Sequence, residues 1–86
     1  MDVKYVSYFY VAMLCGENAP KVPLKKCKRA HGYLICKDVN EKVDFIIMTD
    51  SDGALCPVAI KLRNSDTIYV DELHPLSLNM LTSMLN

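Results

Sequence analysis

Short apolar runs separated by turn residues are the feature that most constrains how this chain folds. Three runs, residues 33–37, 43–49 and 54–62, are mainly apolar, have the length of strands and are bounded by turn residues. The polar segment 38–42 between the first two has the length of a hairpin loop. In Asp50-Ser51-Asp52-Gly53, which follows, aspartate and serine bond their own backbone and glycine accepts a positive φ. The middle of the chain therefore predicts consecutive antiparallel strands.

The segments on either side complete the expected fold. Residues 3–14 are apolar on both alternating faces, which predicts one long strand covered on both sides. Pro57 cannot donate to a strand ladder, so we expect it to face outward on an edge or to mark a bulge. The remaining expected elements are an edge-like segment at 24–29, a short strand at 67–70 and a helix at 76–85.

Together these segments predict a mainly β protein with a C-terminal helix, folded as a small antiparallel five-stranded barrel or a strongly bent sheet. The 86 residues amount to a single domain, 1–86, because cores split only above roughly 250 residues. A domain of this size buries only about 60–65% of the surface of its unfolded chain. We therefore expect a surface groove or a partner interface rather than a large enclosed active site.

The cysteines favour a reduced protein. Cys15, Cys27, Cys36 and Cys56 show no pair at the two-residue spacing of a zinc knuckle or a redox motif. Three of them lie in apolar runs, where a reduced cysteine packs as a small hydrophobic residue. A disulfide framework stays open for an even count, and His31 could join two cysteines around zinc. We expect reduced core cysteines and no metal.

The N-terminal apolar stretch, residues 5–14, superficially resembles the core of a signal peptide. Asp2 beside Lys4 removes the net positive charge that such a leader carries, and no small-x-small cleavage site follows. We therefore expect a soluble intracellular protein, cytoplasmic or nuclear, with no membrane partner.

Charge is distributed unevenly, although ten basic and ten acidic residues cancel. Residues 21–37 hold six of the ten basic residues and no acidic residue, whereas acidic residues dominate 38–72. A basic face that also offers a tyrosine suits single-stranded nucleic acid, with lysines on phosphates and an aromatic ring on a base. A solvated edge that discourages aggregation, or a site for an acidic protein partner, would show the same pattern. The candidate nucleic-acid-binding residues are Lys25, Lys26, Lys28, Arg29 and Tyr33.

A second hypothesis is a protein-interaction or homodimerisation module. The expected C-terminal helix carries leucines and methionines, and methionine adapts to variable contacts. The apolar N-terminal strand would add to the same surface. The candidate interface residues are Tyr5, Phe9, Leu76, Met80, Leu81 and Met84.

Catalytic signatures are missing from the sequence. Gly16, Gly32 and Gly53 are isolated from one another, so no glycine loop cradles a phosphate. His31 and His74 lie in no recognisable signature for a cysteine nucleophile. We therefore expect a binding module without catalytic residues or a cofactor, and not an enzyme.

Gly32-Tyr33-Leu34 together with residues 45–55 resembles the early strands of OB-fold nucleic-acid-binding domains. The resemblance implies a five-stranded Greek-key barrel that binds single-stranded nucleic acid or a protein across its second and third strands. The segment between Leu62 and Thr67 has no room for the helix usual in that family, so the N-terminal strand would have to serve as the fifth strand. The C-terminal helix after Pro75 is similar to chromo and chromoshadow domains, which often dimerise or bind peptides. The chain has no tryptophan, so methyl-lysine binding is not carried over.

Overall fold

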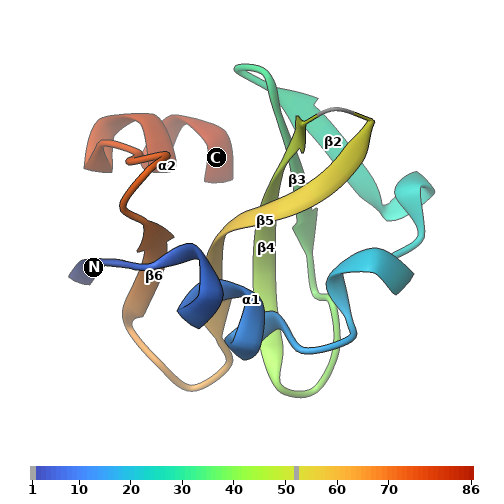
Figure 1. Ribbon diagram of the computed structural model, residues 1–86, viewed down its shortest axis with the longest axis horizontal. Coiled ribbons are helices and arrows are strands. Elements are labelled where there is room, and N and C mark those ends of the chain that lie inside the picture. The colour runs from blue at the N-terminus through green and yellow to red at the C-terminus, as the bar shows by residue number, and fades with distance from the viewer. Residues whose placement is uncertain (1, 52) are drawn as a thin grey trace.

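Six strands form one mixed sheet in the computed structural model, which describes residues 2–51 and 53–86 (Figure 1). The strand order is β1-β6-β5-β4-β3-β2, with β1 parallel to β6 and every other pair antiparallel. The strands are β1 (Asp2–Val6), β2 (Cys27–Ala30), β3 (Tyr33–Lys37), β4 (Val43–Ser51), β5 (Ala54–Leu62) and β6 (Thr67–Asp71). The other elements are α1 (Tyr8–Cys15), the 3-10 turns η1 (Ala19–Lys21) and η2 (Leu24–Lys26), and α2 (Leu78–Leu85).

Of the two predicted forms, a five-stranded barrel or a strongly bent sheet, the barrel is wrong because the sheet is open. The sheet also has six strands rather than five, and β1 pairs parallel to β6 where every pair was expected to be antiparallel. The expected mainly β fold with a C-terminal helix is confirmed. Closure would need β1 to reach β2, but β1 adds to β6 at the far end of the sheet. Within the described residues, β1 and β2 therefore each keep one edge without a strand partner.

The long N-terminal strand expected at 3–14 is also wrong. The strand β1 is short, and Ser7 then caps α1 by accepting a hydrogen bond from the backbone N–H of Tyr10. Val11 and Cys15, four residues apart, are buried against the sheet. The apolar side chains favoured a strand on propensity alone, but the cap and this helical packing outweigh that preference.

Each face of the sheet has its own apolar core. The core on the α2 side is built from Ile35, Phe45, Ile47, Val58, Ala59, Ile68, Val70, Leu76, Leu81 and Met84. The core on the α1 side is built from Val11, Cys15, Ala19, Leu34, Cys36, Val43, Ile46, Met48 and Ile60. The central strands are buried on both faces, which explains why their sequences read as continuous apolar runs. The helix α2 begins two residues later than expected, with Ser77 as its N-cap.

Pro57 marks a bulge, which is one of the two settings predicted for it. Met48 pairs with Pro57 while Ile47 pairs with Ala59, so Val58 is the extra residue on β5. The turn expected at 50–53 includes Asp52, which lies outside the described residues. Gly53 beside it has a φ of 79°.

Candidate nucleic-acid interface at the β2 edge

A tight turn sets the position of the edge strand β2. His31 and Gly32 have φ values of 55° and 81°, the positive values that a two-residue hairpin turn of type I′ requires. Four residue pairs follow from this turn and hold β2 on β3. The register alternates side chains strictly, so neighbouring cations on β2 point to opposite faces of the sheet.

A disulfide fastens the same strand. Cys27 lies directly opposite Cys36 in the register, with the Cα atoms 4.3 Å apart, and their sulfurs are bonded. The expectation of reduced cysteines is therefore wrong for this pair, because the turn brings two residues nine positions apart into contact. Cys15 and Cys56 are free thiols, and burial raises the pKa of the Cys15 thiol to about 12. Disulfides persist mainly in oxidising compartments, so this bond gives no support to the expected intracellular location. That location stays a prediction.

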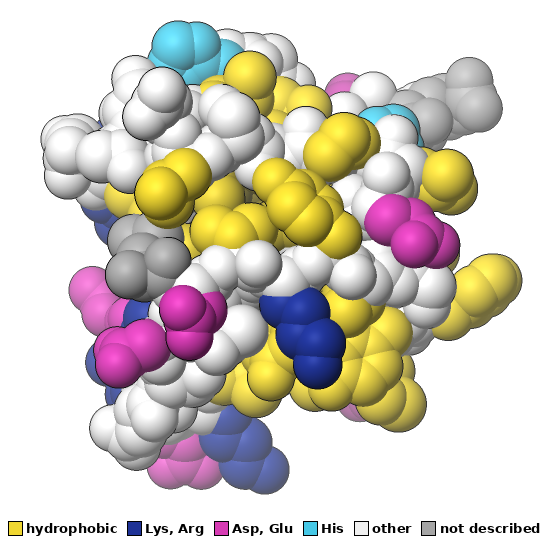
Figure 2. All heavy atoms as spheres, turned by 90° about the vertical axis from the view of Figure 1, so that its left-hand side faces the viewer, with side chains coloured by type: hydrophobic (Ala, Val, Ile, Leu, Met, Phe, Trp, Pro, Cys, Tyr) yellow, Lys and Arg dark blue, Asp and Glu magenta, His cyan; other side chains and the backbone are white. Residues whose placement is uncertain are grey.

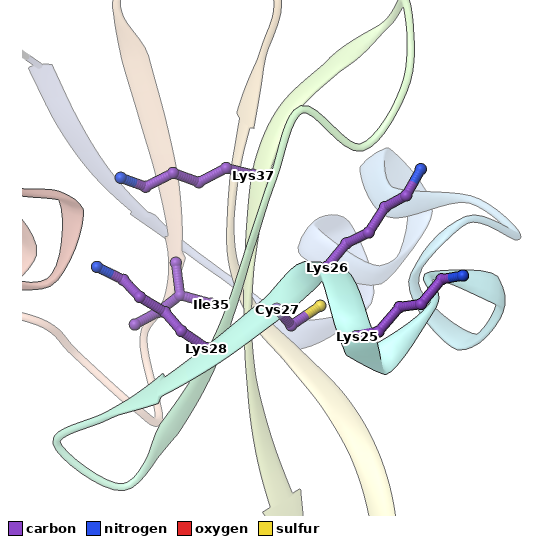
Figure 3. Close-up of a pocket in the computed structure, with 6 residues that line it drawn as sticks. All are labelled: Lys25, Lys26, Cys27, Lys28, Ile35 and Lys37. Atoms are coloured by element: carbon purple, nitrogen blue, oxygen red, sulfur yellow. The ribbon is translucent and has the colours of Figure 1, made fainter.

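A shallow hollow of about 270 Å³ lies along this edge (Figure 3). Four lysines surround it, and the aliphatic side chain of Ile35 forms an apolar part of its lining. The lining residues are Lys25, Lys26, Cys27, Lys28, Ile35 and Lys37. Long lysine stems beside an apolar surface leave their charged ends in solvent, where an anion can reach them.

The four amines form two pairs that extend in opposite directions. Figure 3 shows Lys28 and Lys37 on one side of the β2–β3 pair and Lys25 and Lys26 on the other. Strand alternation explains why Lys28 and Lys37 lie on the same face. Lys28 lies opposite Ile35 in the register, and Lys37 follows Ile35 by two residues along β3. Lys37 also donates a hydrogen bond to the carbonyl oxygen of Leu85, near the end of α2. The arrangement therefore offers positive charge on both flanks of one edge.

The cations of this edge are not neutralised by the protein. All four lysines are exposed, as is Arg29, and in residues 2–51 and 53–86 none of the five forms an ion pair with a carboxylate. The ion pairs of that part of the chain use Lys21, Lys61 and Arg63 instead. The β2 edge therefore carries uncompensated positive charge that an external anion can neutralise.

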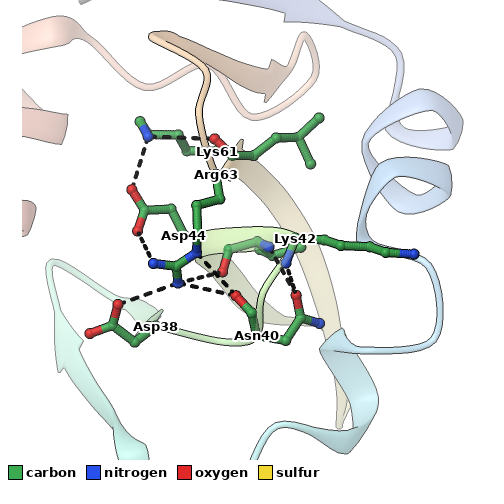
Figure 4. A network of polar contacts seen from close by, with 8 residues as sticks. Asp38, Asn40, Lys42, Asp44, Lys61 and Arg63 are labelled. Atoms are coloured by element: carbon green, nitrogen blue, oxygen red, sulfur yellow. Dashed lines mark hydrogen bonds and ion pairs between the residues drawn. The ribbon is translucent and has the colours of Figure 1, made fainter.

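Asp38 and Asp44, which line a second hollow together with Lys37, belong to a separate polar network (Figure 4). The guanidinium of Arg63 donates to the carbonyl oxygens of Asn40 and Val43 and lies 3.4 Å from a carboxylate oxygen of Asp38. Lys61 donates to Asp44 at 2.9 Å, and this hydrogen bond, with the charges of Lys61 and Arg63, lowers the pKa of Asp44 against its partial burial. The network fastens the β3–β4 loop to the end of β5 and gives Asp38 and Asp44 cationic partners other than the lysines of the β2 edge.

The structure brings together three of the five candidate nucleic-acid-binding residues, Lys25, Lys26 and Lys28. Arg29 pairs with Leu34, whose side chain belongs to the α1-side core, so strand alternation directs Arg29 to the other face. Tyr33 is half-buried and packs on the α2-side core, on the same face as Lys28. Lys37 was missed as a site residue, although its position two residues after Ile35 in an expected strand would have placed it on this face.

The candidate interface residues divide into two groups. Leu76, Leu81 and Met84 are fully buried against the sheet, so they are not available to a partner. Tyr5, Phe9 and Met80 are exposed by 48%, 82% and 37%. Figure 2 shows hydrophobic side chains gathered in the middle of the face that carries β6 and α2. The exposed part of this set is thus spread over β1, α1 and α2.

Other kinds of site find no support in the described residues. Within residues 2–51 and 53–86, no three histidine, cysteine or acidic side chains gather closely enough to hold a metal ion. The buried acid Asp71 accepts a hydrogen bond from the backbone N–H of Leu73, which closes the turn after β6. No helix in this part of the chain combines the length and apolar character needed to span a membrane.

Comparison of the chain with family models, with curated proteins and with solved structures finds no match in any of the three. The resemblance to OB-fold and chromo-type domains therefore stays a prediction, and the site has to be interpreted from its own geometry.

Proposed function

We propose that this protein is a non-enzymatic binding module whose β2 edge binds single-stranded nucleic acid, alone or as a subunit of a nucleic-acid-associated complex. The observation that carries the proposal is the set of lysines around the β2 hollow that no carboxylate of the described residues neutralises. Phosphate contacts of this kind release counterions and supply most of the affinity of sequence-independent binding.

The separation of the amines into two pairs favours a polyanion over a single phosphate group. A site for one phosphate needs donors that converge, whereas Lys28 and Lys37 extend away from Lys25 and Lys26. A nucleic-acid backbone that crosses the edge strand would meet one pair on each flank. The exposed part of the Tyr33 ring, on the face of Lys28, would then stack on a base.

A second candidate function is a protein-interaction module, and the outer face of α1 favours it. Phe9 and Met13, one helical turn apart, are exposed by 82% and 66%, and α1 contains no charged residue. A helix that is apolar on all sides is usually covered. An acidic protein on the β2 edge is a further outcome that the following experiment separates from nucleic acid.

The test measures the affinity of a labelled, mixed-sequence single-stranded oligonucleotide by fluorescence anisotropy at low and moderate salt. Four lysine contacts predict a loss of affinity of about 50-fold for a fourfold rise in salt. The triple variant Lys25→Glu, Lys26→Glu, Lys28→Glu should lose at least roughly tenfold in affinity and nearly all of the salt dependence.

The control for charge is a pair of double variants that change net charge equally. Lys25→Glu with Lys28→Glu reverses two hollow lysines, whereas Lys21→Glu with Lys42→Glu reverses two exposed lysines outside the hollow. Equal losses in the two doubles would assign binding to net charge alone and reject the β2 edge. A triple variant that keeps wild-type affinity and unfolds at the same urea concentration would also reject it.

A further inference from the structure

The outer edge of β1 presents backbone groups that the sheet leaves unused. The N–H of Asp2 donates to the carbonyl oxygen of Asp66 at 3.1 Å, and the carbonyl oxygen of Val6 accepts from the N–H of Glu72 at 2.8 Å. Residues 2, 4 and 6 therefore direct their backbone groups to β6, because successive residues alternate in a strand. Val3 and Tyr5 direct theirs outward, where no strand of the described residues pairs with them.

The side chains of this strand carry one charge of each sign. Asp2 and Lys4 share a face, the α1 side, since Lys4 is paired with Tyr69 of that layer. Both are exposed, and within the described part of the chain neither forms an ion pair. A segment with the order acid, apolar, base is complementary to itself when it is read in the opposite direction.

We propose that β1 is a homodimerisation edge, on which the β1 strand of a second copy pairs antiparallel about a twofold axis at Val3. In this register, Val3 lies opposite Val3 of the second copy, and their outward N–H and C=O groups form two reciprocal hydrogen bonds. Asp2 of each copy lies opposite Lys4 of the other, which gives two cross-strand ion pairs. The sheet then continues through both molecules, with the two α2 helices on the same side.

The charges of Asp2 and Lys4 favour this register and favour a second copy of β1 as the partner strand. An axis placed at Lys4 would set Lys4 opposite Lys4 of the second copy, and like charges directly opposite are unfavourable. The β2 edge cannot pair with itself in the same way, because Lys28 and Arg29 would face further cations. A second copy of β1 therefore meets complementary charge, and the proposal does not depend on nucleic-acid binding.

The test is a charge swap read out by sedimentation equilibrium of the whole chain from micromolar to millimolar concentration. The wild-type protein should dimerise reversibly. Asp2→Lys sets lysine opposite lysine and Lys4→Asp sets aspartate opposite aspartate, so each single variant should raise the dimer dissociation constant by about tenfold or more. The double variant restores opposite charges and should return to within about threefold of wild type.

Circular dichroism tests whether each variant still folds. Both side chains are exposed, so each variant should keep the spectrum of the wild type. A matched swap, Glu17→Lys with Lys21→Glu, reverses an exposed ion pair outside β1 and should leave the dissociation constant unchanged. A wild type that stays monomeric at millimolar concentration overturns the proposal. A double variant as weak as the single variants overturns the register.

Discussion

The two open edges of the sheet are built in opposite ways. The β2 edge is cross-linked by a disulfide, ends in a tight turn and carries charges of one sign only, all positive. The β1 edge has no cross-link, pairs in parallel with β6, and carries one acid and one base that match each other. A row of like charges repels a second copy of the same strand and attracts a polyanion, whereas a self-complementary strand does the reverse. Under the two proposals together, one small sheet would keep two kinds of partner apart by charge order alone.

The largest expected effect concerns the disulfide, which the β2 edge has and the β1 edge lacks. Replacing Cys27 and Cys36 together by serine should lower the free energy of unfolding by about 2–3 kcal/mol, because the unfolded chain regains the freedom of a short closed loop. Urea unfolding of the variant and of the wild type measures the difference. Dithiothreitol should bring the wild type to the value of the variant and should not change the variant. Equal stability of the oxidised wild type and the variant would show that the disulfide does not hold the β2 edge.

A proline comparison tests which backbone groups of β1 face outward. Lys4→Pro removes an N–H that donates toward β6, whereas Val3→Pro removes one that faces the open edge. Both substitutions restrict φ alike, so Lys4→Pro should be the less stable variant by about 2 kcal/mol in urea unfolding. The same Val3→Pro substitution should abolish dimerisation. A Val3 variant as unstable as the Lys4 variant would contradict the assigned direction of the strand.

The smallest expected effect concerns how β1 is fastened without a cross-link. The hydroxyl of Tyr5 donates to the carbonyl oxygen of Leu76 at 2.7 Å and ties β1 to the segment that enters α2. Tyr5→Phe should lower the free energy of unfolding by about 1 kcal/mol, measured in urea. Tyr10→Phe is the matched control, since its hydroxyl forms no hydrogen bond within residues 2–51 and 53–86. A loss of similar size in both variants would remove the anchoring role of the Tyr5 hydroxyl.

The central strands could be predicted from the sequence because local signals and tertiary packing agree there. β3 and β5 have the expected bounds, and β4 and β6 extend the expected strands by one or two residues. Their runs are flanked by turn residues, and the two-sided core buries most of their apolar positions. For Pro57 the sequence narrowed the setting to an outward edge position or a bulge, because proline has no N–H for the ladder, and the structure shows the bulge.

The N-terminal segment could not be predicted from propensity. Its side chains are apolar all round, so the pattern shows neither the two-residue nor the 3.6-residue period that separates strand from helix. Ser7 was the signal that could have divided the run, since serine is a preferred N-cap. The position of β1 beside β6 depends on contacts between distant residues, which the sequence does not display.

The candidate site was predictable in composition and not in arrangement. The basic stretch is evident from the sequence, but the direction of each lysine depends on the register of β2 and β3. That register follows from the turn at His31-Gly32: stepping outward from it pairs Arg29 with Leu34 and, two pairs later, Cys27 with Cys36. A turn one residue longer would shift the register by one residue, direct every β2 cation to the other face and separate the cysteines.

The parallel pairing of β1 with β6 also has a consequence for how the chain acquires its structure. Residue 2 pairs with residue 67, so β1 has no partner strand until the residues between them have been synthesised. The hairpins of β2 to β5 join neighbours along the chain and can form earlier, because closing short loops loses less entropy. The uncharged segment that becomes α1 packs mainly on β5, so it is exposed to solvent until that strand has been synthesised. The nascent protein therefore presents an apolar, uncharged segment during part of its synthesis, the interval in which a chaperone would bind it.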